Sequence, residues 1–230
     1  MKFFHLSDLH IGLKLMNHDM REDQEYILSE VIEVAGREKP DAIVIAGDIY
    51  DKAVPSAEAV EVFDCFLEKL TEAAPEAVIM MISGNHDSAP RIDCFRKVLS
   101  RQNVYMVGQP PRMETEYIEK VVLKDEYGKV NFYLLPFVKP SMVKQVVGVD
   151  ENGNNLSYNE TLHRLIGREK IIQTREMYLS ATSFIFLPVR MQRMWNVWIP
   201  RCVRSEISMK YQQTCWKNLI MRLLDISINQ

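Results

Sequence analysis

The fold class is decided by AIVIAGD (residues 42–48), an apolar and largely β-branched run that ends in a glycine and a carboxylate. Such a run is typical of a buried strand, and the glycine–aspartate pair marks its end. Residues 3–6 and 77–82 have the same apolar character and are also followed by polar residues. Between these runs, residues 21–38 and 56–73 carry apolar side chains at helical spacing. Strands that alternate with helices predict an α/β fold with parallel sheet segments.

The same patterns predict the buried faces of the helices and the elements that follow them. Ser56 is the predicted N-cap of the second helix. Residues 91–100 predict a short helix, and residues 117–124 and 129–135 predict two strands joined by a turn at residues 125–128. The apolar positions that we expect to face the core in the first two helices are Tyr26, Ile27, Val31, Ile32 and Ala35, and Val60, Phe63, Leu67 and Leu70.

Three polar clusters follow the three predicted strands: Asp8-Leu9-His10, Gly47-Asp48-Ile49-Tyr50-Asp51 and Gly84-Asn85-His86-Asp87. Because sites in open α/β sheets assemble at the carboxyl ends of strands, we expect the three clusters to converge. Carboxylate, imidazole and amide groups suit Mn²⁺, Fe or Mg²⁺ better than metals that prefer thiolates. Any one cluster could be a turn or a helix cap. The three together, each after an apolar strand, indicate a metal site.

These clusters, Asp-x-His, Gly-Asp-x-x-Asp and Gly-Asn-His-Asp, are similar to the first three motifs of the calcineurin-like metallophosphoesterases. The resemblance covers about residues 1–170. It implies a four-layer α/β sandwich, in which two β-sheets lie face to face and are flanked by helices, with an incomplete C-terminal part. The flanking segments narrow the resemblance to bacterial nuclease subunits that work on DNA ends with a coiled-coil ATPase. These segments are HLSDLHIG, AGDIYD, VPSAEA and ISGNHDS, at residues 5–12, 46–51, 54–59 and 82–88.

The resemblance also implies roles for individual residues. Asp48 would bridge two ions, and His86 would act beside the scissile phosphate as an acid or transition-state stabiliser, with Asp87 orienting its ring. The implied cofactor is a pair of Mn²⁺ ions, with Mg²⁺ as an alternative, and they would lower the pKa of a bridging water that attacks phosphorus. The implied partners are DNA ends and the ATPase, and a homodimer stays open. The implied metal ligands are Asp8, His10, Asp48 and Asn85.

Two later motifs of the family, a Gly-His-Gln-like segment and Gly-His-x-His, supply three further metal ligands. This sequence has neither of them, since its last histidine is His163. The composition also changes late in the chain. Residues 172–230 carry eight basic and three acidic side chains, whereas residues 1–171 carry 20 and 28. All three tryptophans and none of the nine glycines lie in the later part. Such a break indicates a domain boundary or a basic interaction tail.

Back-translation suggests a cause for both observations. Codons can be chosen for residues 175–184 so that the same DNA also encodes a second peptide. Read in the frame that begins at the third base of each present codon, it specifies Arg-Asn-Val-Ser-Ile-Gly-His-Gln-Phe. In the same frame, residues 218–230 become Phe-Asp-Tyr-Ala-Ala-Leu-Gly-His-Ile-His-Lys-Pro. We therefore predict that residues 1–171 are the N-terminal portion of a nuclease domain. Residues 172–230 are then an out-of-frame basic tail that follows a frame shift near residues 171–173. A genuine basic DNA-binding tail is the alternative.

Composition narrows the function further. No apolar run approaches the roughly 20 residues that a membrane helix needs, and the start of the chain turns polar too early for a signal peptide, so we expect a cytoplasmic protein. The four cysteines have neither the spacing of a zinc site nor that of a redox motif. The predicted function is that of a metal-dependent DNA nuclease subunit, impaired in this chain. The alternatives are a small-molecule phosphoesterase and a non-catalytic remnant that binds DNA or a partner.

Overall fold

The first sheet of the protein is parallel and carries the predicted buried strands. The computed structural model describes residues 1–169 and 176–181. The parallel sheet consists, in spatial order, of β1 (Phe3–Leu6), β4 (Ala42–Ala46), β5 (Val78–Ile82) and β6 (Val104–Val107). Strand β4 is buried along its whole length, as expected for a central strand of a parallel sheet. The predictions at residues 3–6, 42–46 and 77–82 are confirmed to within one residue, whereas β6 was not predicted.

The second sheet is mixed. Strands β7 (Glu119–Asp125) and β8 (Gly128–Leu135) form the predicted antiparallel hairpin, and β9 (Glu176–Ala181) pairs in parallel with β8. The turn between β7 and β8 is closed by the Asp125 carboxylate, which accepts hydrogen bonds from the backbone of Tyr127 (2.8 Å) and Gly128 (3.0 Å). A separate short hairpin, β2 (Lys14–Leu15) with β3 (His18–Asp19), follows the first polar cluster.

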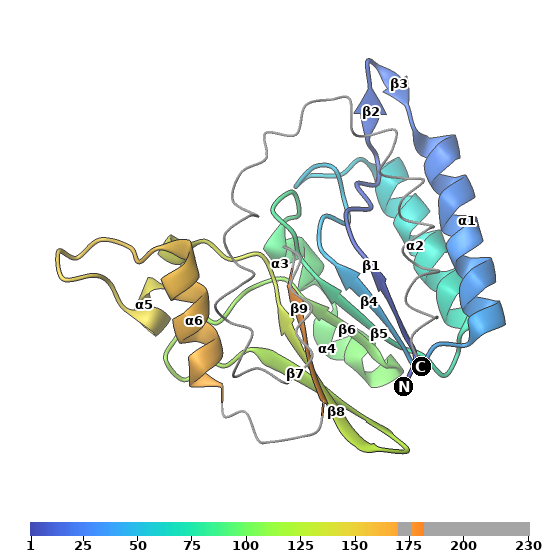
Figure 1. Ribbon diagram of the computed structural model, residues 1–230. Coiled ribbons are helices and arrows are strands. Elements are labelled where there is room, and N and C mark those ends of the chain that lie inside the picture. The colour runs from blue at the N-terminus through green and yellow to red at the C-terminus, as the bar shows by residue number, and fades with distance from the viewer. Residues whose placement is uncertain (170–175, 182–230) are drawn as a thin grey trace. The chain divides into compact units, whose positions relative to one another are not determined.

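The two sheets pack face to face through one apolar core. The rings of Phe3 in β1 and Phe132 in β8 meet edge to face with their centres 5.6 Å apart. In the view of Figure 1, α2 and α1 lie outside the parallel sheet and α6 lies outside the second sheet. The predicted α/β class, with two sheets packed together and flanked by helices, is therefore confirmed. The shared core consists of Ala42, Val44, Ala46, Met80, Ile82 and Val107 from the parallel sheet and Val121, Val130, Phe132 and Leu134 from the second.

The two long helices begin and end as predicted, and four of their predicted core positions, Val31, Ala35, Phe63 and Leu70, are buried. Helix α1 spans Arg21–Glu38 and α2 spans Ala57–Ala73, where the Ser56 hydroxyl accepts a hydrogen bond from the Ala59 amide at 3.3 Å. The predicted core positions Tyr26 and Val60 are exposed. The faces that pack inward have the continuous three- and four-residue spacing of one helical stripe. They are Gln24, Leu28, Val31 and Ala35 in α1, and Ala59, Val62, Phe63, Phe66 and Leu70 in α2.

The helix predicted at residues 91–100 is wrong. Three short turns replace it: α3 (Ala89–Ile92), α4 (Arg96–Leu99) and the 3₁₀ turn η1 (Ser100–Gln102). Phe95 separates the first two with a φ of +60°, a left-handed conformation that a helix cannot continue through.

The remaining helices follow β8 and were not predicted. They are η2 (Pro140–Met142), α5 (Lys144–Val147) and α6 (Tyr158–Arg168). The Ser157 hydroxyl caps α6 by accepting from the Glu160 amide at 3.2 Å, and this Ser-x-x-Glu spacing is a start signal that the sequence contains. Within residues 1–169 and 176–181, no helix has both the length and the apolar character needed to cross a membrane.

Most of the predicted out-of-frame tail lies outside the described residues. The predicted boundary at residue 171 falls in the undescribed segment 170–175. Of residues 172–230, the structure describes residues 176–181, which form β9. The interpretation of residues 172–230 as an out-of-frame tail therefore stays a prediction.

His5 makes the stability of the fold depend on pH. Burial in β1 lowers its pKa to about 4, although the nearby Asp8 carboxylate opposes this shift. In the unfolded chain the pKa returns to about 6.5, so the unfolded state binds more protons between these values. The free energy of unfolding should therefore fall by up to about 3 kcal/mol as the pH drops from 6.5 to 4.

The replacement His5→Gln isolates this contribution, because all other titrating groups are shared with the parent. Urea unfolding at pH 7.0 and pH 4.5 should show a smaller loss of stability in the variant than in the parent. Equal losses in the two proteins would contradict the prediction.

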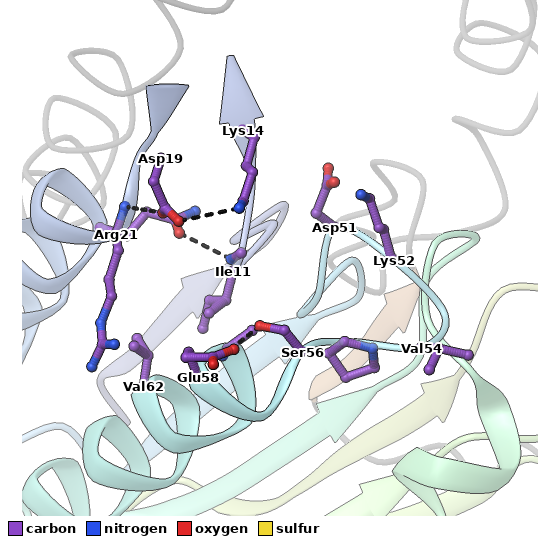
Figure 2. Close-up of a pocket in the computed structure, with 14 residues that line it drawn as sticks. Ile11, Lys14, Asp19, Arg21, Asp51, Lys52, Val54, Ser56, Glu58 and Val62 are labelled. Carbon is purple, nitrogen blue, oxygen red and sulfur yellow. Dashed lines mark hydrogen bonds and ion pairs between the residues drawn. The ribbon is translucent and has the colours of Figure 1, made fainter. Parts of the chain in front are cut away.

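A pocket of about 570 Å³ opens beside the hairpin β2–β3 and the first turns of α1 and α2 (Figure 2). Its charges are largely balanced within the protein. The Lys14 ammonium lies 3.6 Å from the Asp19 carboxylate, and the Arg21 guanidinium lies 2.7 Å from Glu25. Ile11 and Asp51, which also line it, belong to the loops after β1 and β4. The pocket therefore adjoins the predicted site.

Candidate metal centre

The first two polar clusters are joined through their backbones. The loop after β1 runs beside the loop after β4 and continues the parallel pairing of the two strands. The Asp8 amide donates to the Gly47 carbonyl oxygen (3.2 Å), and the His10 amide donates to the Asp48 carbonyl oxygen (2.9 Å). Ile11 continues the series by donating to Ile49 at 2.9 Å. The sheet register thus brings two predicted ligand loops together.

Three of the predicted metal ligands have a left-handed backbone. Their φ angles are +56° at Asp8, +44° at His10 and +49° at Asp48. Non-glycine residues seldom adopt this conformation, and each instance costs roughly 1–3 kcal/mol. Such strain persists where surrounding contacts impose it, and it gathers at functional sites. Lys39 and Phe95 share this conformation outside the cluster, so it is the side chains of these positions that indicate a site.

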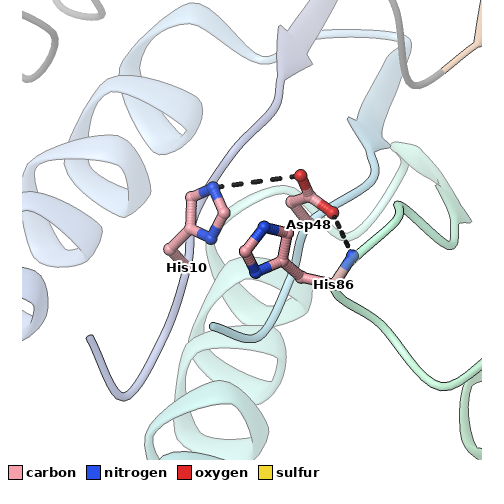
Figure 3. A group of neighbouring side chains, drawn as sticks. All are labelled: His10, Asp48 and His86. Atoms are coloured by element: carbon pink, nitrogen blue, oxygen red, sulfur yellow. Dashed lines mark hydrogen bonds and ion pairs between the residues drawn. The ribbon is translucent and has the colours of Figure 1, made fainter. Parts of the chain in front are cut away.

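The side chains of His10, Asp48 and His86 form one cluster, with candidate donor atoms all within 4.8 Å of one another (Figure 3). His10 Nε2 lies 3.9 Å from an Asp48 carboxylate oxygen and 4.0 Å from an Asp8 carboxylate oxygen. Two donor atoms that each lie about 2.1 Å from a shared cation are about 3–4 Å apart. The spacing of His10, Asp48 and Asp8 therefore fits an ion held between them.

Asp48 is the most buried carboxylate of this cluster, and the third loop closes over it. Burial raises its pKa, while the hydrogen bond from the His86 amide (2.9 Å) and the two imidazoles oppose this. A cation beside it would favour the ionised form that coordination requires. Gly84 permits the close approach, because a Cβ atom at that position would lie 2.0 Å from the Asp48 carboxylate. The glycine before Asn85 therefore has a steric role.

Asp51 contacts both imidazoles of the cluster, a role that the sequence analysis did not assign. Its carbonyl oxygen lies 2.9 Å from His86 Nδ1, so the opposite ring nitrogen of His86 is not used in this contact. Its carboxylate lies 3.8 Å from His10 Nδ1. That nitrogen is buried and has no hydrogen-bond partner within the described residues. Carboxylates orient metal-binding histidines by accepting a hydrogen bond from the second ring nitrogen, and at 3.8 Å Asp51 lies near His10 without making that bond. The second aspartate of the Gly-Asp-x-x-Asp motif is Asp51, so the motif already pointed to this residue.

The role predicted for Asp87 differs from what the structure shows. Its carboxylate accepts hydrogen bonds from the backbone amides of Gly84 (2.8 Å), Ile49 (3.1 Å) and Tyr50 (3.0 Å). It therefore joins the loop after β5 to the loop after β4. The His86 ring is oriented by Asp51 instead, because three buried amides already use the Asp87 carboxylate.

Asn85, the remaining predicted ligand, is exposed and lies between Gly84 and His86 in the loop after β5. The structure thus brings Asp8, His10, Asp48 and His86 together, with Asn85 adjacent in the chain. The pocket of Figure 2 lies beside this group, and its lining includes Asp51. Clustered carboxylate and imidazole donors, next to an imidazole with one available nitrogen, suit a divalent cation and acid–base or electrostatic help to a phosphate.

This fold and donor set define the class of the protein. Residues 1–172 match the family model described as calcineurin-like phosphoesterase, and the chain belongs to that family.

Its curated relatives are more specific. It is 35% identical over 137 residues to the SbcD component of nuclease SbcCD from Staphylococcus saprophyticus, covering 60% of this chain and 34% of that protein. It is 36% identical over 144 residues to the same component from Staphylococcus epidermidis, covering 63% and 36%. The chain therefore spans about a third of the length of these relatives.

Among solved structures, a dimetal phosphatase from Danio rerio is 16% identical, with a TM-score of 0.35 over 71% of this chain and 49% of that one. A likeness of this size carries no argument about function.

Proposed function

We propose that this chain is the N-terminal portion of an SbcD-like nuclease subunit, which hydrolyses phosphodiester bonds at DNA ends together with an SbcC-like coiled-coil ATPase. The observation that carries the proposal is the cluster of His10, Asp48 and His86 on three strand-end loops. The identity to the SbcD components of nuclease SbcCD supports DNA as the substrate. As part of this proposal, the protein is cytoplasmic and acts in DNA repair, recombination and replication.

Divalent cations, in our proposal Mn²⁺, would clamp the phosphate and activate a water when bound. The residues of this chain would hold and orient the reactants. Asp8, His10 and Asp48 surround one position, where Asp48 presents two oxygens and can serve a second ion. Asn85 would contribute its amide oxygen to that second position. His86, fixed by the Asp51 carbonyl, would place its other ring nitrogen beside the scissile phosphate and stabilise charge or protonate the leaving oxygen.

We also propose that activity is impaired in the chain as written. Four of the proposed ligands precede residue 172, but the three histidines of the later family motifs do not occur in this sequence. Each ion would then have too few protein ligands for tight binding. The family match ends at residue 172, next to the proposed frame shift, which supports placing the change there.

The substrate class can be tested directly. A protein with the proposed original reading frame restored, purified with its ATPase partner, should degrade linear duplex DNA in the presence of Mn²⁺. This reaction should be much faster than cleavage of a chromogenic phosphodiester supplied at the same concentration of phosphodiester bonds. The physical reason is that a DNA strand contributes binding energy beyond the reacting phosphate. Cleavage of the small ester with no activity on DNA ends would instead favour a small-molecule phosphoesterase. Activity on neither substrate would contradict the proposal and favour a non-catalytic remnant.

A further inference from the structure

The loop that carries His10 is held from the side of α1 by one buried side chain, Gln24. This residue is 3% exposed. Its amide nitrogen donates to the carbonyl oxygens of His10 (2.8 Å) and Leu9 (3.3 Å), and its amide oxygen accepts from the Gly12 amide (3.0 Å). One side chain thus pairs with three backbone groups of a four-residue loop. Only an amide can do this, because the loop offers two acceptors and one donor.

Gln24 completes a set of contacts that impose an unfavourable backbone. His10 has a φ of +44°, and its backbone N–H donates a hydrogen bond to the Asp48 carbonyl oxygen in the loop after β4. Ala59 in α2 also lies close to the loop, because a Cβ atom at Gly12 would be 3.0 Å from the Ala59 Cβ, so the loop has little room to relax. Without the Gln24 amide, the Leu9 carbonyl and the Gly12 amide would lose this partner, whereas the His10 carbonyl would keep only the Leu13 amide at 3.0 Å.

We propose that Gln24 is a positioning residue for His10, acting through the loop backbone to aim the imidazole at Asp8 and Asp48. The inference rests on the proposed metal site. The direction of the His10 Cα–Cβ bond follows from the backbone that Gln24 holds. The 3.9 and 4.0 Å separations from His10 Nε2 to the two carboxylates depend on that direction. Groups that orient metal ligands in this way typically change metal affinity about 10–100-fold when they are removed.

The test uses the 230-residue chain with Gln24→Leu, which keeps the approximate size and removes all three hydrogen bonds. Gln24→Glu is a second variant, since it keeps the acceptor for Gly12 and loses both donations. Thr161→Val is the matched control: Thr161 is 1% exposed and donates to Ser157 at 2.8 Å within α6, outside the cluster. Its loss should destabilise the fold without reaching the site.

Two measurements separate positioning from stability. Ring signals of labelled histidines, with His10 assigned by their loss in His10→Ala, report the imidazole environment without metal. Titration with Mn²⁺ then reports, by paramagnetic broadening of those signals, the concentration at which the ion reaches His10. Both Gln24 variants should shift the His10 ring signals and should need at least about tenfold more Mn²⁺ than the parent. Thr161→Val should lower the melting temperature and leave both readouts at the parent values.

The inference is overturned if folded Gln24→Leu or Gln24→Glu protein gives parental His10 signals. It is also overturned if Thr161→Val shifts them equally, since that would show a general effect of stability. Should Mn²⁺ fail to broaden the His10 signals even in the parent, the proposed metal site fails in this chain. The metal-free spectra would still decide whether Gln24 positions His10.

Discussion

Adding one base near codon 172 should convert this chain from a protein with little or no nuclease activity into an active one. We expect Mn²⁺-dependent cleavage of DNA ends, with the ATPase partner present, to rise by about a thousandfold or more, because metal-based activation of water requires a complete ligand set. The restored frame would replace residues 172–230 with a segment that contains the three missing histidines. Mn²⁺ affinity, measured by electron paramagnetic resonance of the free ion, should rise in parallel.

Addition of three bases at the same place is the matched control, since it lengthens the chain by one residue and keeps the present frame. This control should behave as the chain as written. The hypothesis fails if the 230-residue chain already binds two Mn²⁺ tightly and degrades DNA at a rate close to that of the frame-restored protein. It fails equally if residues 172–230 prove to be a compact and protease-resistant part of the domain.

Loss of Asp48 should have the second largest effect. In the frame-restored protein, Asp48→Ala should reduce both Mn²⁺ binding and DNA cleavage to background, because this carboxylate presents oxygens to both proposed ion positions and also accepts from the His86 amide. His86→Ala should instead keep most of the Mn²⁺ affinity and lower kcat by about 10²–10⁴-fold, the usual contribution of a general acid or a transition-state donor. Single-turnover cleavage and metal titration of the same preparations separate the two effects.

Comparison of these two variants tests whether Asp48 is a metal ligand and His86 a catalytic group. Asp51→Asn is a useful companion, because it keeps the carbonyl oxygen that holds His86 and changes only the carboxylate near His10. A His86→Ala protein that cleaves at the parental rate would remove His86 from the mechanism. If His86→Ala lost Mn²⁺ as completely as Asp48→Ala does, His86 would be a ligand rather than a catalytic group.

The sequence by itself determined the elements and the positions of the ligand loops. The apolar run at residues 42–46 must be buried, and its β-branched side chains and the glycine and aspartate that follow favour a short strand that ends there. Residues 21–38 and the Ser56 cap bounded α1 and α2 because helix periodicity and capping are local properties. The three polar clusters were identified for the same reason, since each is a short motif next to a strand.

The sequence predicted Val31, Ala35, Phe63 and Leu70 as buried, but the tertiary structure alone decided that Gln24 joins them and Tyr26 does not, and which polar groups contact one another. Tyr26 has a large apolar ring but is exposed, whereas the polar Gln24 is buried. Gln24 packs inward because its amide hydrogen-bonds to the backbone of the loop that carries His10. Asp51 and Asp87 are both acidic residues of the motifs, and no local pattern tells which orients an imidazole and which binds three backbone amides. Such pairings depend on distances between loops that lie far apart in the chain, and the sheet register sets those distances.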